Sequence, residues 1–249
     1  MALALYHNPI STCSQKVRLA LAEKRLRFES HVINFDRQEH LSEWYLKLNP
    51  NGVVPTLVHD DQPVIDSSVI CEYLDEVFPE PALAPANALG RAQMRAWMRY
   101  FEEVPTVAIR VPSFNRVFAR FLTAMESEDF QAMTDKMPLR KHFYRQMGPR
   151  GFSDQTYDES IDKLRRCVER VAVALADGRA YILGPEYSIA DIVLVPTVVR
   201  MDDLGLRLWD DLPVVAAWYE RVQARPAFDV AYFPGSRIKL AAFETTAGN

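Results

Sequence analysis

The sequence predicts two parts of different fold class, an α/β layer followed by an all-helical domain. Strand-like and helix-like segments alternate in the first part, which is typical of an α/β layer of about eighty residues. Three of the seven residues from Pro79 to Pro85 are proline, and such a stretch indicates a semi-rigid linker because it cannot sustain a helix. Beyond it, apolar residues recur at helical spacing and no convincing strand follows. We therefore expect an N-terminal domain at 1–78, a linker at 79–87 and a helical domain at 88–249.

The first part contains short apolar or alternating segments typical of strands, and segments with apolar residues at helical spacing. The expected strands lie at 3–6, 28–33, 56–58 and 63–65. Two of the expected helices can be given residue ranges, 14–24 and 67–77. The predicted order is strand, helix, strand, helix, strand, strand, helix. This order indicates an α/β layer.

The second part is expected to be helical, with helices at 91–125, 161–175, 188–204 and 213–224. Pro105 and Pro112 should kink or break the first of these helices. The clearest amphipathic pattern is at 161–175, where apolar residues recur at spacings of 3, 4, 3 and 4. Ser188 and Asp191 form a capping-box pattern, which is a folding signal and carries no chemistry.

The amino-acid composition argues against some classes of binding partner. With 29 Lys+Arg against 33 Asp+Glu, the net charge of −4 argues against nucleic-acid binding and against a polybasic membrane anchor. No apolar run approaches the ~20 residues that span a bilayer, and the N-terminus lacks the basic region of a signal peptide. The 3 cysteines lie far apart without a C-x-x-C pair, which suits a reducing compartment. We expect a cytoplasmic protein with no nucleic-acid or membrane partner and no metal site.

The segment from Ser11 to Ser14 lies between the first strand and the first helix, where ligands collect in open α/β sheets. A thiolate bound there would receive hydroxyl and N–H bonds together with the positive end of the helix dipole. Two other interpretations stay open. The segment can be a loop of capping residues, or Cys13 can itself be a nucleophile, although no His or second Cys stands near it in the sequence.

Three further positions can bind a ligand. If the Val54–Pro55 bond is cis, the Val54 N–H and C=O face outward for an extended peptide, although only ~5% of X–Pro bonds are cis. Asp66 and Ser67 open a helix, where they either cap it or bind a ligand's ammonium and carboxylate groups. Sequence alone favours the cap. His40 is a lone histidine, for which a solvated position is the default.

Taken together, these motifs resemble the glutathione S-transferase superfamily over nearly the whole chain. The resemblance rests on the segments 11–24, 49–55, 66–67 and 188–191, and on their order around the proline-rich linker. It implies a thioredoxin-like N-terminal domain that binds glutathione as co-substrate and a helical domain that binds a hydrophobic small molecule. It also implies a homodimer and a cis bond before Pro55. The cis bond is the opposite of what the low frequency of cis X–Pro bonds would lead us to expect.

The resemblances to different subgroups of the superfamily indicate different residues as the one that activates the sulfur. His40-Leu-Ser resembles the theta class and Ser11-Thr-Cys-Ser the zeta class, and both classes use a serine that matches Ser11. The segments 68–80 and 95–97, and an insertion ending at 150–152, are most similar to bacterial β-etherases. In that group, the residues facing the sulfur match Cys13 and Ser14. We prefer Ser11, because Ser14 at the helix start is expected to act as a cap.

Two departures from the family affect the glutathione contacts. Theta proteins place a lysine where this chain has Val53, so that contact is missing. Most relatives carry Glu at Asp66, so the shorter side chain is expected to hold the glutamyl end less tightly. The resemblance assigns the remaining contacts to His40, Val54, Pro55, Asp66 and Ser67.

The implied activity is glutathione transfer to a hydrophobic, aromatic electrophile, including cleavage of a β-aryl ether. One alternative is mixed-disulfide chemistry at Cys13, as in reductive dehalogenases or thiol transferases, and another is a non-catalytic carrier of aromatic ligands. Residues 108–150 hold eight Lys/Arg against four Asp/Glu, which either draws anionic aromatic substrates or is a solvated face. The aromatic surface for the co-substrate is expected from Trp97, Tyr100, Phe101, Phe114, Phe118 and Phe121.

Overall fold

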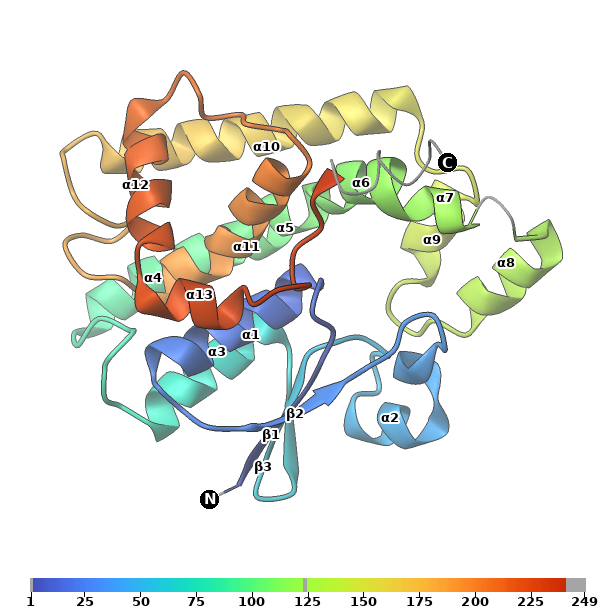
Figure 1. The fold of residues 1–249 in the computed structure, drawn as a ribbon. Helices are drawn as coiled ribbons and strands as arrows, with labels where there is room; N and C mark the ends of the chain where they lie inside the picture. The colour runs from blue at the N-terminus through green and yellow to red at the C-terminus, as the bar shows by residue number, and fades with distance from the viewer. Residues whose placement is uncertain (1, 123–124, 241–249) are drawn as a thin grey trace.

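A four-stranded mixed sheet forms the base of the N-terminal part in the computed structural model (Figure 1). The structure describes residues 2–122 and 125–240, with only the backbone of residues 120 and 121. The sheet order is β2-β1-β3-β4, with β1 and β2 parallel and the other pairs antiparallel. The strands are β1 (Leu3–His7), β2 (Glu29–Val32), β3 (Thr56–His59) and β4 (Gln62–Ile65). All four predicted strands are confirmed.

The helices of this part complete the predicted α/β order. They are α1 (Thr12–Glu23), the short η1 (Glu39–Leu41), α2 (Glu43–Leu48) and α3 (Ser67–Val77). The second helix of that order, which sequence analysis did not place, is therefore α2. The expected start of α1 at position 14 is wrong: the helix begins two residues earlier, at Thr12, and its N-cap is Ser11.

Helices make up the regular elements of the described chain from Ala88 to position 240. They are α4 (Ala88–Glu103), α5 (Pro105–Ala108), α6 (Arg110–Ser113), the π-helix η2 (Phe114–Phe118), α7 (Ala119–Leu122), α8 (Ser127–Asp135), α9 (Lys141–Met147), α10 (Asp154–Leu175), α11 (Ile189–Asp203), α12 (Pro213–Gln223) and α13 (Pro226–Ala231). The all-helical prediction is confirmed, and sequence analysis missed α8, α9 and α13.

The two prolines of the first long helical segment behave differently. Pro105 separates α4 from α5, because it takes the first position of the new helix, where its missing N–H costs nothing. Pro112 lies inside α6, which ends one residue later and passes directly into the π-turn of η2. The segment is therefore divided into several short successive helices.

The linker is held by one buried cation. The Lys24 Nζ donates to the Phe78 and Pro81 carbonyls at 2.6 and 2.8 Å, and it pairs with Asp75 at 2.6 Å. Its side chain is fully buried. These bonds tie the end of α1 to the point where the chain leaves the α/β layer.

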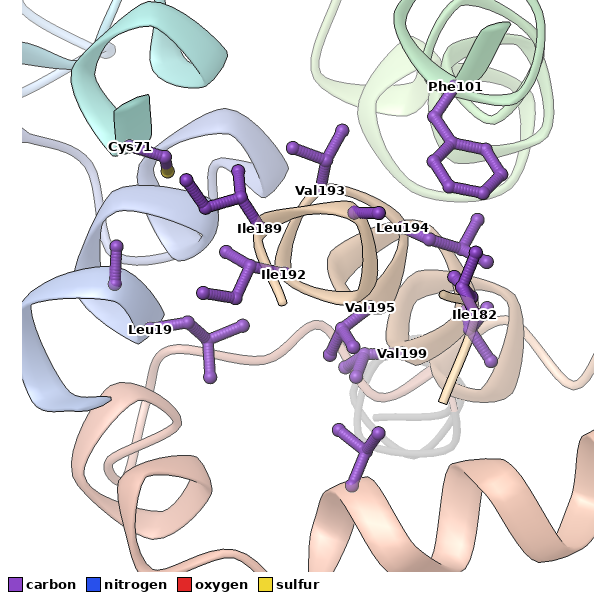
Figure 2. Packing of buried hydrophobic residues seen from close by; sticks show 14 of the residues in the cluster. Leu19, Cys71, Phe101, Ile182, Ile189, Ile192, Val193, Leu194, Val195 and Val199 are labelled. Carbon is purple, nitrogen blue, oxygen red and sulfur yellow. The ribbon is translucent and has the colours of Figure 1, made fainter. Parts of the chain in front are cut away.

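Helix α11 is the centre of a core shared by both parts. Fourteen of its fifteen residues are buried, which is typical of a helix surrounded by other elements. In Figure 2, Ile189 points toward Cys71 of α3, and Ile192 points toward Leu19 of α1. Because these contacts cross between the parts, they hold α1 and α3 against the helical domain.

Asp191 organises the start of α11, as the capping pattern predicted. Its carboxylate is fully buried and accepts bonds from Ser188 N–H at 3.0 Å and from Ser188 Oγ at 2.9 Å. The Ile182 N–H and the Trp218 Nε1 donate to its other oxygen at 3.1 and 2.9 Å. Both oxygens are thus occupied by structural donors, which leaves this residue no part in chemistry.

Candidate functional site

The strand register brings three loops to one edge of the sheet. Tyr6 near the end of β1 pairs with Thr56 at the start of β3, and Thr56 pairs with Ile65 at the end of β4. The segments that follow β1, precede β3 and follow β4 therefore meet at this edge. They carry the Ser11–Ser14 segment, the Val54–Pro55 bond and the Asp66–Ser67 pair, which the sequence analysis singled out separately.

Ser11 and Ser14 have different environments. The Ser11 Oγ accepts a bond from the Ser14 N–H at 3.3 Å, so Ser11 caps α1. The Ser14 Oγ accepts from the Asn8 N–H at 3.3 Å, and this side chain is fully buried. The expectation that Ser14 is the cap is wrong, because the bond spans from the residue before the helix to its third N–H. The Ser11 hydroxyl is half-buried and keeps its own hydrogen for another acceptor.

Cys13 faces the helical domain. The Arg110 guanidinium of α6 lies close to the Cys13 thiol, which is half-buried. Arg200 holds α6 near this loop, since it donates both to the Ile10 carbonyl and to the Ser113 hydroxyl. Sequence analysis missed Arg110, and the only signal for it was the basic excess between positions 108 and 150.

The Val54–Pro55 peptide bond is cis, as the family resemblance implied. Two side chains shape the loop before it, because Tyr45 Oη and Asn49 Nδ2 both donate to the Val53 carbonyl at 2.8 Å. Neither the N–H nor the C=O of Val54 makes a hydrogen bond within the described chain. These two groups are therefore available to an extended peptide.

Asp66 is the N-cap of α3, and only part of its carboxylate is used. The Oδ1 accepts from the Ser68 N–H at 3.0 Å and from the Val69 N–H at 3.3 Å. The Asp66 side chain is exposed, so its second oxygen can reach a ligand. Ser67 is buried, and its hydroxyl makes no hydrogen bond with any described residue. Capping and ligand binding are thus compatible at this pair.

His40 is not the solvated residue expected by default. It is half-buried in η1 with its ring edge-on to Phe35, 5.0 Å between centroids. Burial lowers the pKa of this imidazole. Its Nδ1 is buried without a partner among the described residues. A neutral ring with a free nitrogen at this position suits a polar contact to a ligand.

The other two cysteines are core residues, as expected. Cys71 and Cys167 are almost fully buried. Burial raises the pKa of the Cys71 thiol far above its usual range and that of Cys167 to about 12. Both thiols therefore stay protonated and unreactive.

The predicted aromatic surface divides into three groups. Phe101 is fully buried in the core. Trp97 and Tyr100 stack under Arg170 of α10, with the guanidinium carbon 4.8 and 4.0 Å from their ring centroids. Phe114 and Phe118 pack together in η2 next to α9, and the side chain of Phe121 lies outside the described residues. The η2 pair belongs to the stretch that carries Arg110.

The described residues contain no helix long and apolar enough to cross a bilayer. In the same part of the chain, no group of three or more His, Cys, Asp or Glu side chains is arranged to hold a metal ion.

A thioredoxin-like domain with a cis-proline loop, joined to an all-helical domain, defines a class of thiol-binding proteins. Residues 10–77 match the N-terminal domain family of glutathione S-transferases, and residues 154–221 match the C-terminal domain family. The chain belongs to the glutathione S-transferase family, with glutathione as its co-substrate.

Among curated relatives, Protein LigF of Sphingobium sp. is 32% identical over 96% of each chain. The crystal structure of β-etherase LigF superposes with a TM-score of 0.83 at 31% identity, covering 93% of this chain and 99% of that one. A stringent starvation protein A homolog of Coxiella burnetii is 39% identical over 83% of this chain and 79% of its own. A tetrachloro-p-hydroquinone reductive dehalogenase of Sphingobium chlorophenolicum is 25% identical over 92% of this chain and 95% of its own.

Proposed function

We propose that the protein activates the glutathione thiol with the Ser11 hydroxyl and transfers the thiolate to an aromatic electrophile. The observation that carries this assignment is the half-buried Ser11 Oγ, which accepts from the Ser14 N–H and retains its hydrogen as a donor. The α1 dipole and the neighbouring N–H groups add positive potential at the same point.

The remaining glutathione contacts follow from groups that the fold leaves unsatisfied. The free Val54 N–H and C=O suit the cysteinyl backbone of the tripeptide. The Ser67 hydroxyl and its own N–H at the start of α3 suit the glutamyl carboxylate, and the exposed side of Asp66 suits its ammonium group. His40 lies on η1 and suits a polar contact to the glycyl end.

The size of the required effect is reasonable for one hydroxyl. A free cysteine thiol has a pKa of about 8.5, and lowering it by two units takes ~2.7 kcal/mol. A charge-assisted hydrogen bond contributes about 1.5–3 kcal/mol, so the Ser11 bond supplies most of this amount.

For a β-aryl ether, the thiolate sulfur attacks the carbon that bears the aryloxy group. The C–S bond forms as the C–O bond breaks, and the departing phenolate takes up a proton to become a phenol. The likeness to β-etherase LigF over nearly the whole chain supports this substrate class.

A second candidate uses Cys13. Its half-buried thiol and the nearby Arg110 charge favour mixed-disulfide chemistry with glutathione, and a reductive dehalogenase is among the relatives. In that case Cys13→Ser abolishes turnover, whereas transfer through Ser11 survives it. A protein that only carries aromatic ligands would form no glutathione adduct at all.

Two finer assignments belong to the same proposal. A reducing cytoplasmic location is supported by three free cysteines, two of them buried. A homodimer is supported by the family to which the chain belongs.

Mass spectrometry of glutathione adducts tests the proposal. The purified protein is incubated with glutathione and a panel of aryl halides, epoxides and β-aryl ethers. We expect thioether adducts from at least one aromatic class, formed by Cys13→Ser as well. Absence of adducts across the panel would contradict the proposed transfer.

A further inference from the structure

Two half-buried arginines lie near one another in the helical part of the chain. Arg110 of α6 and Arg140, the residue before α9, are close enough for their charges to act on each other, and the Cys13 thiol lies close to Arg110. Neither forms an ion pair with a described carboxylate. Glu102 acts on Arg110 from a distance, but its own carboxylate is held by Lys16 at 2.7 Å.

Their neighbours in the sequence behave differently. Lys141 and Arg145 both pair with Asp135, at 3.1 and 2.8 Å, and Lys136 and Arg150 are exposed to water. The basic excess of this stretch is therefore satisfied or solvated at these positions. Arg110 and Arg140 are the half-buried exceptions among the described side chains.

The segment before Arg140 covers the glutathione edge of the sheet. Pro138 packs directly on Gly52, since a β-carbon added there would lie 3.0 Å from its Cδ. Gly52 has a φ of +59° and leads into the Val54–Pro55 bond. In Figure 1, α8 and α9 lie on the same side of the molecule as α2. The segment that leads into Arg140 is thus packed against the loop that carries the Val54–Pro55 bond.

Tyr144 completes the cluster. It lies one helical turn after Arg140, and the charges of Arg140 and Arg110 both act on its hydroxyl. Its ring packs edge-on against Phe114, 5.5 Å between centroids, and Phe114 contacts Phe143 at 5.1 Å. The basic groups of Arg110 and Arg140 therefore lie next to the aromatic rings of Phe114 and Phe143.

Arg110 and Tyr144 are both in the right protonation state to bind an anion. Burial, with the Arg140 charge adding to it, lowers the pKa of Arg110 to about 10, so Arg110 stays charged at neutral pH. Burial raises the pKa of Tyr144 to about 12, so its hydroxyl stays protonated. Two like charges held together away from water are costly, and a bound anion removes that cost.

We propose that Arg110 and Arg140, with the Tyr144 hydroxyl as a third donor, bind a carboxylate carried by the aromatic co-substrate. The planar guanidinium fork matches a carboxylate, and the ring of the same molecule packs on the Phe114 and Phe143 side. This inference rests on the proposed glutathione transfer and names its substrate class as aromatic electrophiles that bear a carboxylate.

A matched pair of probes tests the carboxylate preference. In 4-chloro-3,5-dinitrobenzoate and the corresponding benzamide, the thiolate forms a C–S bond at the chlorinated carbon and chloride leaves. Each kcat/KM is divided by the rate of the uncatalysed reaction with glutathione. We expect the wild type to prefer the benzoate by about tenfold or more. Arg110→Met and Arg140→Met should bring the ratio close to one, whereas Arg145→Met, an equal charge change at a paired residue, should keep it.

Binding separates failure of this subsite from failure of the proposed function. Calorimetry with the unreactive 3,5-dinitrobenzoate and 3,5-dinitrobenzamide measures the same preference without turnover. If neither chlorinated probe reacts, the transfer proposal is weakened, and tighter benzoate binding that depends on Arg140 still supports the subsite. Equal binding of the two compounds by the wild type, or a preference that persists in both arginine variants, overturns it.

Discussion

The Ser11 Oγ accepts a hydrogen bond from the Ser14 N–H at 3.3 Å, across the first turn of α1. The two serines differ in burial as well, because Ser11 is half-buried and Ser14 is fully buried. The buried Ser14 Oγ in turn receives the Asn8 N–H. One hydroxyl is thus left for a ligand and the other serves the loop.

Ser67→Ala should weaken glutathione binding by roughly 1–3 kcal/mol, because it removes a buried hydroxyl assigned to the glutamyl carboxylate. Calorimetric titration with glutathione measures the change. Ser127→Ala on the exposed start of α8 is the control and should bind normally. An unchanged dissociation constant in Ser67→Ala would refute the carboxylate pocket at α3.

Asp191→Ala should destabilise the fold by about 3 kcal/mol or more, because it leaves several buried donors without an acceptor. Urea unfolding followed by circular dichroism measures the loss. Asp162→Ala removes a surface carboxylate that pairs with Arg166 at 2.8 Å, and it should cost about 0.5 kcal/mol or less. Comparable small losses in both variants would show that the Asp191 network contributes little.

Stability should fall as the pH drops from about 6.5 to about 4 because of His7. Burial, with the Arg18 and His31 charges adding to it, lowers the pKa of His7 from 6.5 to about 4. Between these values the unfolded chain binds a proton that the folded chain does not, so the free energy of unfolding decreases with falling pH, by at most about 3 kcal/mol.

The check on His7 is urea unfolding at several pH values between 7.5 and 4.5. His7→Gln should flatten the slope between pH 6.5 and 4.5, whereas His142→Gln, at an exposed position of α9, should leave it unchanged. An identical slope in wild type and His7→Gln would assign the pH dependence to other groups.

Much of the fold was predictable from local signals. Strand alternation and the capping pattern at Ser188 and Asp191 depend on residues close together in the sequence, and the structure bears them out. Helices α8 and α9 were missed because their stability comes from packing: Phe130 and Met147 are buried in a small cluster of their own, which no short-range pattern announces.

The site was less accessible to sequence reasoning. Ser11 and Ser14 are chemically equal capping candidates, and only the backbone geometry at Ser11, extended at φ −71° and ψ 122°, decides between them. Arg110 meets Cys13 through the packing of two domains, so no sequence spacing predicts their contact. Such long-range pairs require the tertiary structure.

The role of Ser11 is tested most directly by the kinetic pKa of enzyme-bound glutathione, read from the pH dependence of kcat/KM in Ser11→Ala and Ser14→Ala. We predict that Ser11→Ala raises this pKa and lowers kcat/KM about tenfold or more, a loss of ~1.4 kcal/mol or above in transition-state stabilisation. Ser14→Ala should keep the pKa and lose about 1 kcal/mol of stability, because the Asn8 N–H loses its acceptor. A raised pKa in Ser14→Ala together with an unchanged pKa in Ser11→Ala would contradict the assignment. An unchanged pKa in both variants would mean that Cys13 or the backbone amides stabilise the bound thiolate.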